Sequence, residues 1–214
     1  MAALVLAHLG LPWALRALAA GRTGLLPTTV RRRPVAVYAC ATIVLGLLAV
    51  LASQDVRWLG PHPAVGLLAA VVIGVLLPLA VARLAGRPRR PFRRSARPGE
   101  LITLAGSAAA EEVLWRFAAL AVLRAMGLPL VAAAAVALVG FAVLHLPRGT
   151  TRQLPYHLLT GTILTALALT AGLVPAICCH IVHNVVLLTS PRRGLPPPKV
   201  TRPPSLPPTQ GWNT

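Results

Sequence analysis

Acidic residues are scarce in this chain, which has four of them in 214 residues against 21 Lys and Arg. Lysine is nearly absent as well, because Lys199 is the only one. Cysteine is limited to Cys40, Cys178 and Cys179, and this odd count without a CxxC spacing argues against a disulfide framework or a zinc ribbon. All three lie in apolar runs, where they are expected to pack as small hydrophobic residues. No HExxH motif occurs, which removes the common zinc-protease interpretation.

Hydrophobic residues make up 56% of the chain, and the mean hydropathy is +0.73. These values are too high for a soluble domain of this size and predict a polytopic membrane protein. The net charge of +17 comes from arginines in short loops between apolar runs. The positive-inside rule explains this pattern better than nucleic-acid binding does. Because the composition is typical of a bacterial gene of high GC content, we expect an integral protein of the bacterial cytoplasmic membrane, with the lipid bilayer and no nucleic acid as partner.

Apolar runs close to the ~20 residues that a bilayer requires predict an all-α transmembrane helix bundle. The seven runs cover residues 2–20, 34–53, 63–85, 101–124, 127–146, 155–172 and 173–189. The first run is the weakest, because Pro12, Trp13 and Arg16 interrupt it. An interfacial helix or a signal-like segment are alternatives for it, although a basic n-region and a convincing cleavage site are missing.

Arginines concentrate in alternate connections, which are therefore expected to be cytoplasmic. These basic clusters lie at 31–33, 87–97, 148–152 and 192–193. The opposite connections carry little charge.

We divide the chain into three parts. Residues 1–99 hold N-terminal apolar helices and basic loops, and residues 100–189 form the membrane core. Residues 190–214 contain eight prolines and four basic residues, which predicts a disordered cytoplasmic tail.

Two of the acidic residues, Glu111 and Glu112, lie side by side inside an apolar segment. A carboxylate in the hydrocarbon region costs at least ~2.5 kcal/mol on insertion scales, so this pair must be compensated. On a helix at 100° per residue, Glu112 and Arg116 are i,i+4 neighbours that can form an ion pair, while Glu111 faces about 100° away. A purely structural ion pair is one interpretation of Glu112 and Arg116, whereas Glu111 is left for chemistry. Glu100 is expected to begin a helix and Asp55 to lie in a loop.

Polar side chains mark two further segments. Phe141 and His145 are i,i+4 neighbours near the end of one of them, and His180 and Asn184 share one face of residues 173–189. An interfacial histidine is the structural alternative for His145, and interhelical hydrogen bonds are the alternative for His180 and Asn184.

The depths of these residues in the membrane are compatible with one site. At 1.5 Å per residue, Glu111 and His180 both lie roughly 15 Å from the cytoplasmic ends of their helices, and His145 is shallower. We therefore expect the polar side chains to converge on a site that opens toward the cytoplasmic half.

Taken together, the motifs resemble the CPBP (Abi) family of intramembrane proteases, which are relatives of the type II CAAX prenyl endopeptidases. The family pattern is EExxxR, then FxxxH, then HxxxN or HxxxD, each on a different transmembrane helix. The chain supplies Glu111-Glu112-x-x-x-Arg116, Phe141-x-x-x-His145 and His180-x-x-x-Asn184. The similarity covers about residues 100–190. One departure is Thr165, because the family often has a second glycine four residues after Gly161, but threonine is also small enough for close helix packing.

The resemblance implies a glutamate-type endopeptidase that works within the membrane. Glu111 and His145 would activate a water molecule by general-base catalysis. His180 and Asn184 would donate hydrogen bonds to the resulting oxyanion. The supporting residues would be Glu112, Arg116 and Phe141.

The substrate implied by the resemblance is a membrane protein or a lipidated peptide, and no cofactor is expected. Zinc stays an alternative, because Glu111, His145 and His180 are possible ligands. Two other function classes also stay open: a non-catalytic membrane scaffold or bacteriocin-immunity-type binding protein, and a proton-coupled transporter. An inverted repeat of broken helices would favour transport, and the sequence has none. A bacterial source argues against a prenylated CAAX substrate.

Overall fold

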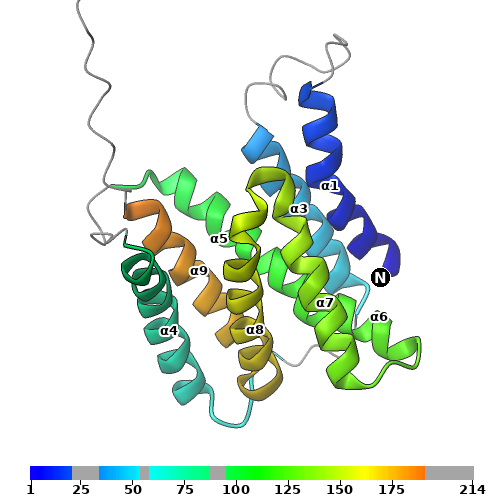
Figure 1. Cartoon of the computed structure of the whole chain (residues 1–214). Helices are drawn as coiled ribbons and strands as arrows, with labels where there is room; N and C mark the ends of the chain where they lie inside the picture. Colours follow the sequence, from blue (N-terminus) through cyan, green and yellow to red (C-terminus); the bar gives the residue numbers. More distant parts are fainter. Residues whose placement is uncertain (21–33, 54–57, 87–94, 191–214) are drawn as a thin grey trace, which may run out of the picture.

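The computed structural model describes residues 1–20, 34–53, 58–86 and 95–190, which are almost entirely helical and contain no strand. The helices run up and down through one bundle (Figure 1). In chain order the α-helices are α1 (Ala2–Ala20), α3 (Pro34–Leu51), α4 (Pro63–Leu84), α5 (Pro98–Glu112), α6 (Ala119–Ala125), α7 (Leu130–Leu144), α8 (Leu154–Ala171) and α9 (Leu173–Thr189). The all-α membrane bundle expected from the sequence is confirmed.

Proline and glycine set several of the helix boundaries. α3, α4 and α5 each begin with a proline, whose fixed φ suits the first helical turn and whose missing N–H is not needed there. Gly172 separates α8 from α9 with a φ of +99°, a conformation that other residues rarely adopt. Glu100 lies in the first turn of α5, as expected, and its Oε2 accepts a hydrogen bond from the backbone N–H of Arg97 (3.3 Å). Asp55 lies outside the described residues.

The segment 101–124 differs from the regular α-helix expected for it. α5 ends at Glu112, and a π-helical segment, η1 (Val113–Ala118), joins it to α6. Hydrophobic periodicity did not reveal this change, because the spacing of Glu112 and Arg116 fits one turn of either kind of helix. π-Helical turns inside helices are rare and are frequent at functional sites. Here the wide turn begins directly after the two glutamates.

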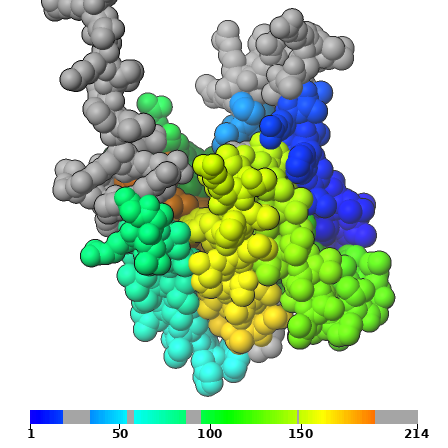
Figure 2. Space-filling view, viewed as in Figure 1, coloured from blue at the N-terminus to red at the C-terminus, as the bar shows by residue number. Residues whose placement is uncertain are grey.

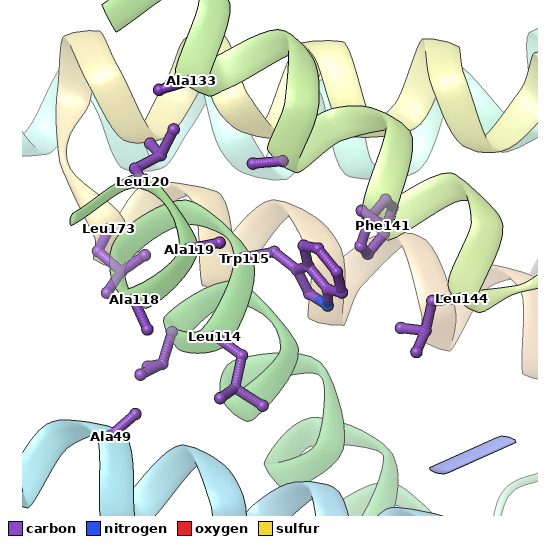
Figure 3. Packing of buried hydrophobic residues seen from close by; sticks show 12 residues of the cluster. Ala49, Leu114, Trp115, Ala118, Ala119, Leu120, Ala133, Phe141, Leu144 and Leu173 are labelled. Atoms are coloured by element: carbon purple, nitrogen blue, oxygen red, sulfur yellow. The ribbon is translucent and has the colours of Figure 1, made fainter. Parts of the chain in front are cut away.

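The main apolar core surrounds η1. Its members come from α3, η1, α6, α7 and α9, and they include Leu114, Trp115, Phe141, Leu144 and Leu173. Figure 3 shows these side chains filling the space between the helices. A side chain at Gly140 would collide with the Trp115 ring, so α7 approaches η1 closely at this point.

The outer face of the bundle is apolar, which fits contact with lipid. Figure 2 shows α4, α8 and α7 side by side along one face of the molecule. Leu76, Val139 and Leu159 on these helices are 57%, 54% and 45% exposed. In the described part of the chain, three helices are long and apolar enough to cross a membrane, and α1, α7 and α9 are shorter apolar helices. The chain is an integral membrane protein.

α1, the weakest of the expected segments, packs against α3, α7 and η1. Its His8 is completely buried. The structure therefore places α1 within the bundle.

The helix ends next to the arginine-rich connections lie together at one end of the bundle. The end of α1 and the starts of α3 and α5 are there, with the ends of α7 and α9 (Figure 1). Much of the basic sequence itself, at 21–33, 87–94 and 191–214, lies outside the described residues, as does nearly all of the predicted tail.

This arrangement makes the orientation testable. A cysteine placed at Ser95, in a chain whose natural cysteines are replaced, is expected to be labelled by an impermeant maleimide only after the cytoplasmic side is opened. Labelling of intact cells from outside would reverse the predicted orientation. A cysteine at Trp58, in the opposite connection, is the matched control and should show the reverse pattern.

Candidate active site

One cavity of about 780 Å³ brings the sequence-predicted site residues together. Glu111, His145, His180 and Asn184 all line it, and so does Phe141. Its walls come from α3, α5, α7, α8 and α9. The lining includes residues at the very start of α3 and α5, so the cavity reaches the end of the bundle where the arginine-rich connections begin.

Glu112 and Arg116 form the ion pair expected from their spacing. Arg116 Nε lies 3.4 Å from Glu112 Oε2, and both side chains are almost completely buried. The guanidinium carbon also lies 4.4 Å from the centre of the Phe141 ring, a cation–π contact. Phe141 therefore covers the charge of Arg116 while its ring edge faces His145.

His180 connects the two glutamates. Its Nδ1 donates a hydrogen bond to Glu112 Oε1 at 2.8 Å, and its Nε2 lies 3.9 Å from Glu111 Oε2. Because Nδ1 carries the proton shared with Glu112, Nε2 can donate only when the ring is an imidazolium. The two negative charges of the glutamates would then be balanced by the positive charges of His180 and Arg116. Such a balance is the condition for burying a cluster of charged groups.

Glu111 is held from a helix that the sequence motifs do not include. Its Oε1 accepts a hydrogen bond from the hydroxyl of Tyr38 on α3 at 3.0 Å, and the carboxylate is buried. The sequence indicated no countercharge near Glu111 on its own helix. The structure supplies its neighbours from two other helices, Tyr38 from α3 and His180 from α9.

His145 follows α7 directly, and its ring is fixed by two contacts. Nδ1 donates to the carbonyl oxygen of Phe141 at 2.8 Å, which leaves Nε2 as the basic nitrogen of the neutral ring. The ring also stacks on His157 of α8, with centroids 4.2 Å apart and an angle of 23° between the planes. Pro147 follows in the short 3₁₀ turn Leu146–Arg148, beyond the end of α7.

Two further polar residues of α9, His183 and Asn184, also line the cavity. Asn184 is half-buried one turn after His180. His183 is buried, and its Nε2 lies 2.7 Å from the hydroxyl of Tyr156.

Three lining residues were missed by the sequence reasoning: Tyr38, Tyr156 and His157. One signal was available, because Tyr38 and Tyr156 are the only tyrosines in the chain. A phenol within an apolar helix needs a hydrogen-bond partner, so both could have been assigned to the polar interior.

The zinc alternative has no preformed ligand group in the described ranges. No set of three or more His, Cys, Asp and Glu side chains there is arranged to hold a metal ion. Zinc binding by Glu111, His145 and His180 would require these side chains to move closer together.

Residues 98–186 match the family model described as type II CAAX prenyl endopeptidase Rce1-like. The match includes α5 and every motif residue from Glu111 to Asn184. No curated protein and no solved structure matches the chain. Residues 98–186 are therefore similar to the Rce1-like family of type II CAAX prenyl endopeptidases, and this similarity supports a CAAX-protease-like enzyme.

Proposed function

We propose that the chain is a glutamate-type endopeptidase that hydrolyses a peptide bond of a membrane-associated substrate. The observation that carries this proposal is the shared cavity of Glu111, His145, His180 and Asn184. It brings two candidate bases and two candidate hydrogen-bond donors to one buried space, next to an ion pair that compensates the second glutamate.

Water activation is assigned to Glu111 and His145. The carboxylate of Glu111 and the basic Nε2 of His145 face the cavity and can take a proton from water as it attacks the scissile carbonyl carbon. The water oxygen forms a bond to that carbon, and the carbonyl oxygen becomes the oxyanion. The C–N bond then breaks as the captured proton passes to the leaving amine, so the base returns to its starting state.

Oxyanion stabilisation is assigned to His180 and Asn184. With Nδ1 donating to Glu112, an imidazolium at His180 presents Nε2–H as the second donor. The amide of Asn184, one helical turn away, supplies a neutral donor. Glu112 and Arg116 support this role, because they hold the His180 ring in orientation and compensate the charge around it.

The cavity walls favour an apolar substrate. Val35, Leu104, Leu187 and Leu188 line the cavity together with the polar groups. A membrane-embedded segment or a lipidated peptide would enter from the end of the bundle and place its scissile bond near Glu111. On the predicted orientation, this entrance faces the cytoplasm. The proposed chemistry uses side chains alone and no cofactor.

Peptidomics of host membranes tests this function. Cells that express the chain should release membrane-derived peptides that cells without it do not, and a synthetic peptide across one such site should be cut by the purified enzyme. A chelator should leave the rate unchanged, because Glu111 and His145 activate the water. Stoichiometric zinc in the enzyme, with activity lost on chelation and restored by metal, would overturn the glutamate assignment. No chain-dependent cleavage would favour a scaffold or a transporter.

Asn184→Ala tests the oxyanion assignment. Loss of one donor to the oxyanion is expected to lower kcat by ~10²–10³-fold, as for other preorganised donors. The side chain is only half-buried, so the folded protein should keep its thermal stability. Leu187→Ala, at another cavity-lining position of α9, is the control for lost packing and should affect mainly KM. An unchanged kcat for Asn184→Ala would remove Asn184 from the mechanism.

A further inference from the structure

A chain of buried hydrogen bonds leads from the core to Glu111. It runs from Trp115 of η1 through His8 of α1 and Tyr38 of α3. The three side chains are 3%, 0% and 3% exposed, so water does not compete for these bonds. Two of the helices, α1 and α3, precede the segment that matches the family model.

The direction of each hydrogen bond follows from the chemistry of its groups. The indole N–H of Trp115 can only donate, and it lies 3.1 Å from His8 Nδ1, so Nδ1 must accept. His8 is therefore neutral with its proton on Nε2. That N–H is shared between the hydroxyls of Tyr38 (2.9 Å) and Thr42 (3.1 Å). The Tyr38 proton is then directed to Glu111 Oε1, because an ionised carboxylate only accepts.

We propose that Trp115, His8 and Tyr38 are positioning residues that orient the Glu111 carboxylate for water activation. This inference rests on the proposed function, because it assigns the neighbours of the same base. Every donor in the chain of hydrogen bonds points toward Glu111, so the network stabilises one rotamer of its anionic form.

The network also gives the two carboxylate oxygens of Glu111 different neighbours. Tyr38 occupies Oε1, while Oε2 is the oxygen that lies on the His180 side of the carboxylate. Fixing Oε1 therefore determines where Oε2 points. A general base must lie within hydrogen-bond reach of the water that it activates, so a rotation of this carboxylate lowers the rate of the chemical step.

The indole N–H has a specific part in this arrangement. It fixes the His8 tautomer, because a proton on Nδ1 would face another donor. Without that constraint, the His8 ring could carry its proton on Nδ1. Its Nε2 would then no longer donate a hydrogen bond to Tyr38. Trp115, a residue of the apolar core, thus determines the tautomer of His8, which is completely buried and does not line the cavity.

Kinetics with a synthetic peptide across an identified cleavage site test the inference. Tyr38→Phe removes one hydroxyl and should lower kcat by about 10- to 100-fold with KM within about twofold of the wild type. His8→Leu should lower kcat to a similar extent, whereas His8→Gln, which keeps one acceptor and one donor, should recover most of it. Trp115→Phe should lower kcat less, and Trp13→Phe on the exposed face of α1 is the matched control with no effect.

Proton positions on His8 provide a readout that does not depend on cleavage. Nitrogen NMR of the imidazoles in the wild-type protein, with the His8 signal assigned by His8→Gln, should show a neutral ring protonated on Nε2. In Trp115→Phe the His8 signal should become a mixture of tautomers, and in Trp13→Phe it should not change.

Either of two results would overturn the inference. One is a His8 ring that carries its proton on Nδ1 or is doubly protonated at neutral pH. The other is a Tyr38→Phe enzyme with the kcat of the wild type, or one whose loss is explained by a smaller folded fraction. Because the NMR result is independent of any substrate, it can stand even where the proposed protease function fails.

Discussion

Glu111→Gln is expected to lower peptide cleavage by ~10²-fold or more, which is the usual contribution of a general base. The substitution keeps the size of the side chain and an oxygen that can accept the hydrogen bond from Tyr38, but it removes the group that takes the proton. Folded yield should hold, because His180 can stay neutral when Glu111 no longer carries a charge, so the buried cluster remains balanced. The loss should therefore appear in kcat, with the protein intact by size-exclusion chromatography and thermal unfolding.

The control for this substitution is Glu100→Gln on the same helix. Glu100 lies about three turns closer to the end of the bundle, where it accepts a hydrogen bond at the start of α5. The same chemical change there should leave kcat within about threefold, since the first-turn charge contributes mainly to helix stability. Full activity in Glu111→Gln would remove the glutamate mechanism altogether.

Arg116→Ala should affect folding as strongly as it affects catalysis. It leaves the buried carboxylate of Glu112 without its cation, and breaking a fully buried pair in this way costs about 3 kcal/mol or more. It also removes the guanidinium that contacts the face of Phe141. Thermal unfolding in detergent should show a large drop in midpoint, and the yield of folded protein should fall together with activity.

Two comparisons separate the buried pair from a general loss of charge. Arg124→Ala removes an exposed guanidinium from α6 and should change stability by less than about 1 kcal/mol. Adding Glu112→Gln to Arg116→Ala should recover part of the lost stability, because the uncompensated carboxylate is then gone. A stable Arg116→Ala protein would mean that Glu112 is compensated in another way.

The fold class could be predicted from the sequence, because hydropathy identifies the segments that are buried in the bilayer or in the protein core. The apolar runs predicted the helices. Gly172 and the prolines lie close to several of the helix ends that the structure shows. The π-helical turn of η1 could not be found in this way, since hydropathy does not distinguish a π-helical turn from an α-helical one. Periodicity at 100° per residue still predicted the pair of Glu112 and Arg116, because four residues span about one turn in both kinds of helix.

The site was only partly predictable, for a related reason. Glu111, His145 and His180 stood out because polar groups are costly in an apolar helix. Their partners are less conspicuous, since Tyr38 and Trp115 are amphipathic residues that are common in membrane helices. His8 lies in the segment with the weakest helical signal. The stacking of His157 on His145 depends on how α8 passes α7, which no pattern within either helix encodes.

The close contact between α3 and α5 gives the bilayer a way to influence the rate. A Cβ at Gly46 would lie 2.6 Å from the Ala110 Cβ, so the two backbones are in close contact there, and this contact is taken as the pivot for a tilt of α3 against α5. Tyr38 is eight residues along α3 from the pivot, a lever of about 12 Å. A tilt of ~5° would then move the Tyr38 backbone by about 1 Å, enough to weaken its 3.0 Å hydrogen bond to Glu111. Because helices tilt to match membrane thickness, peptide cleavage should vary with the length of the lipid chains around the enzyme.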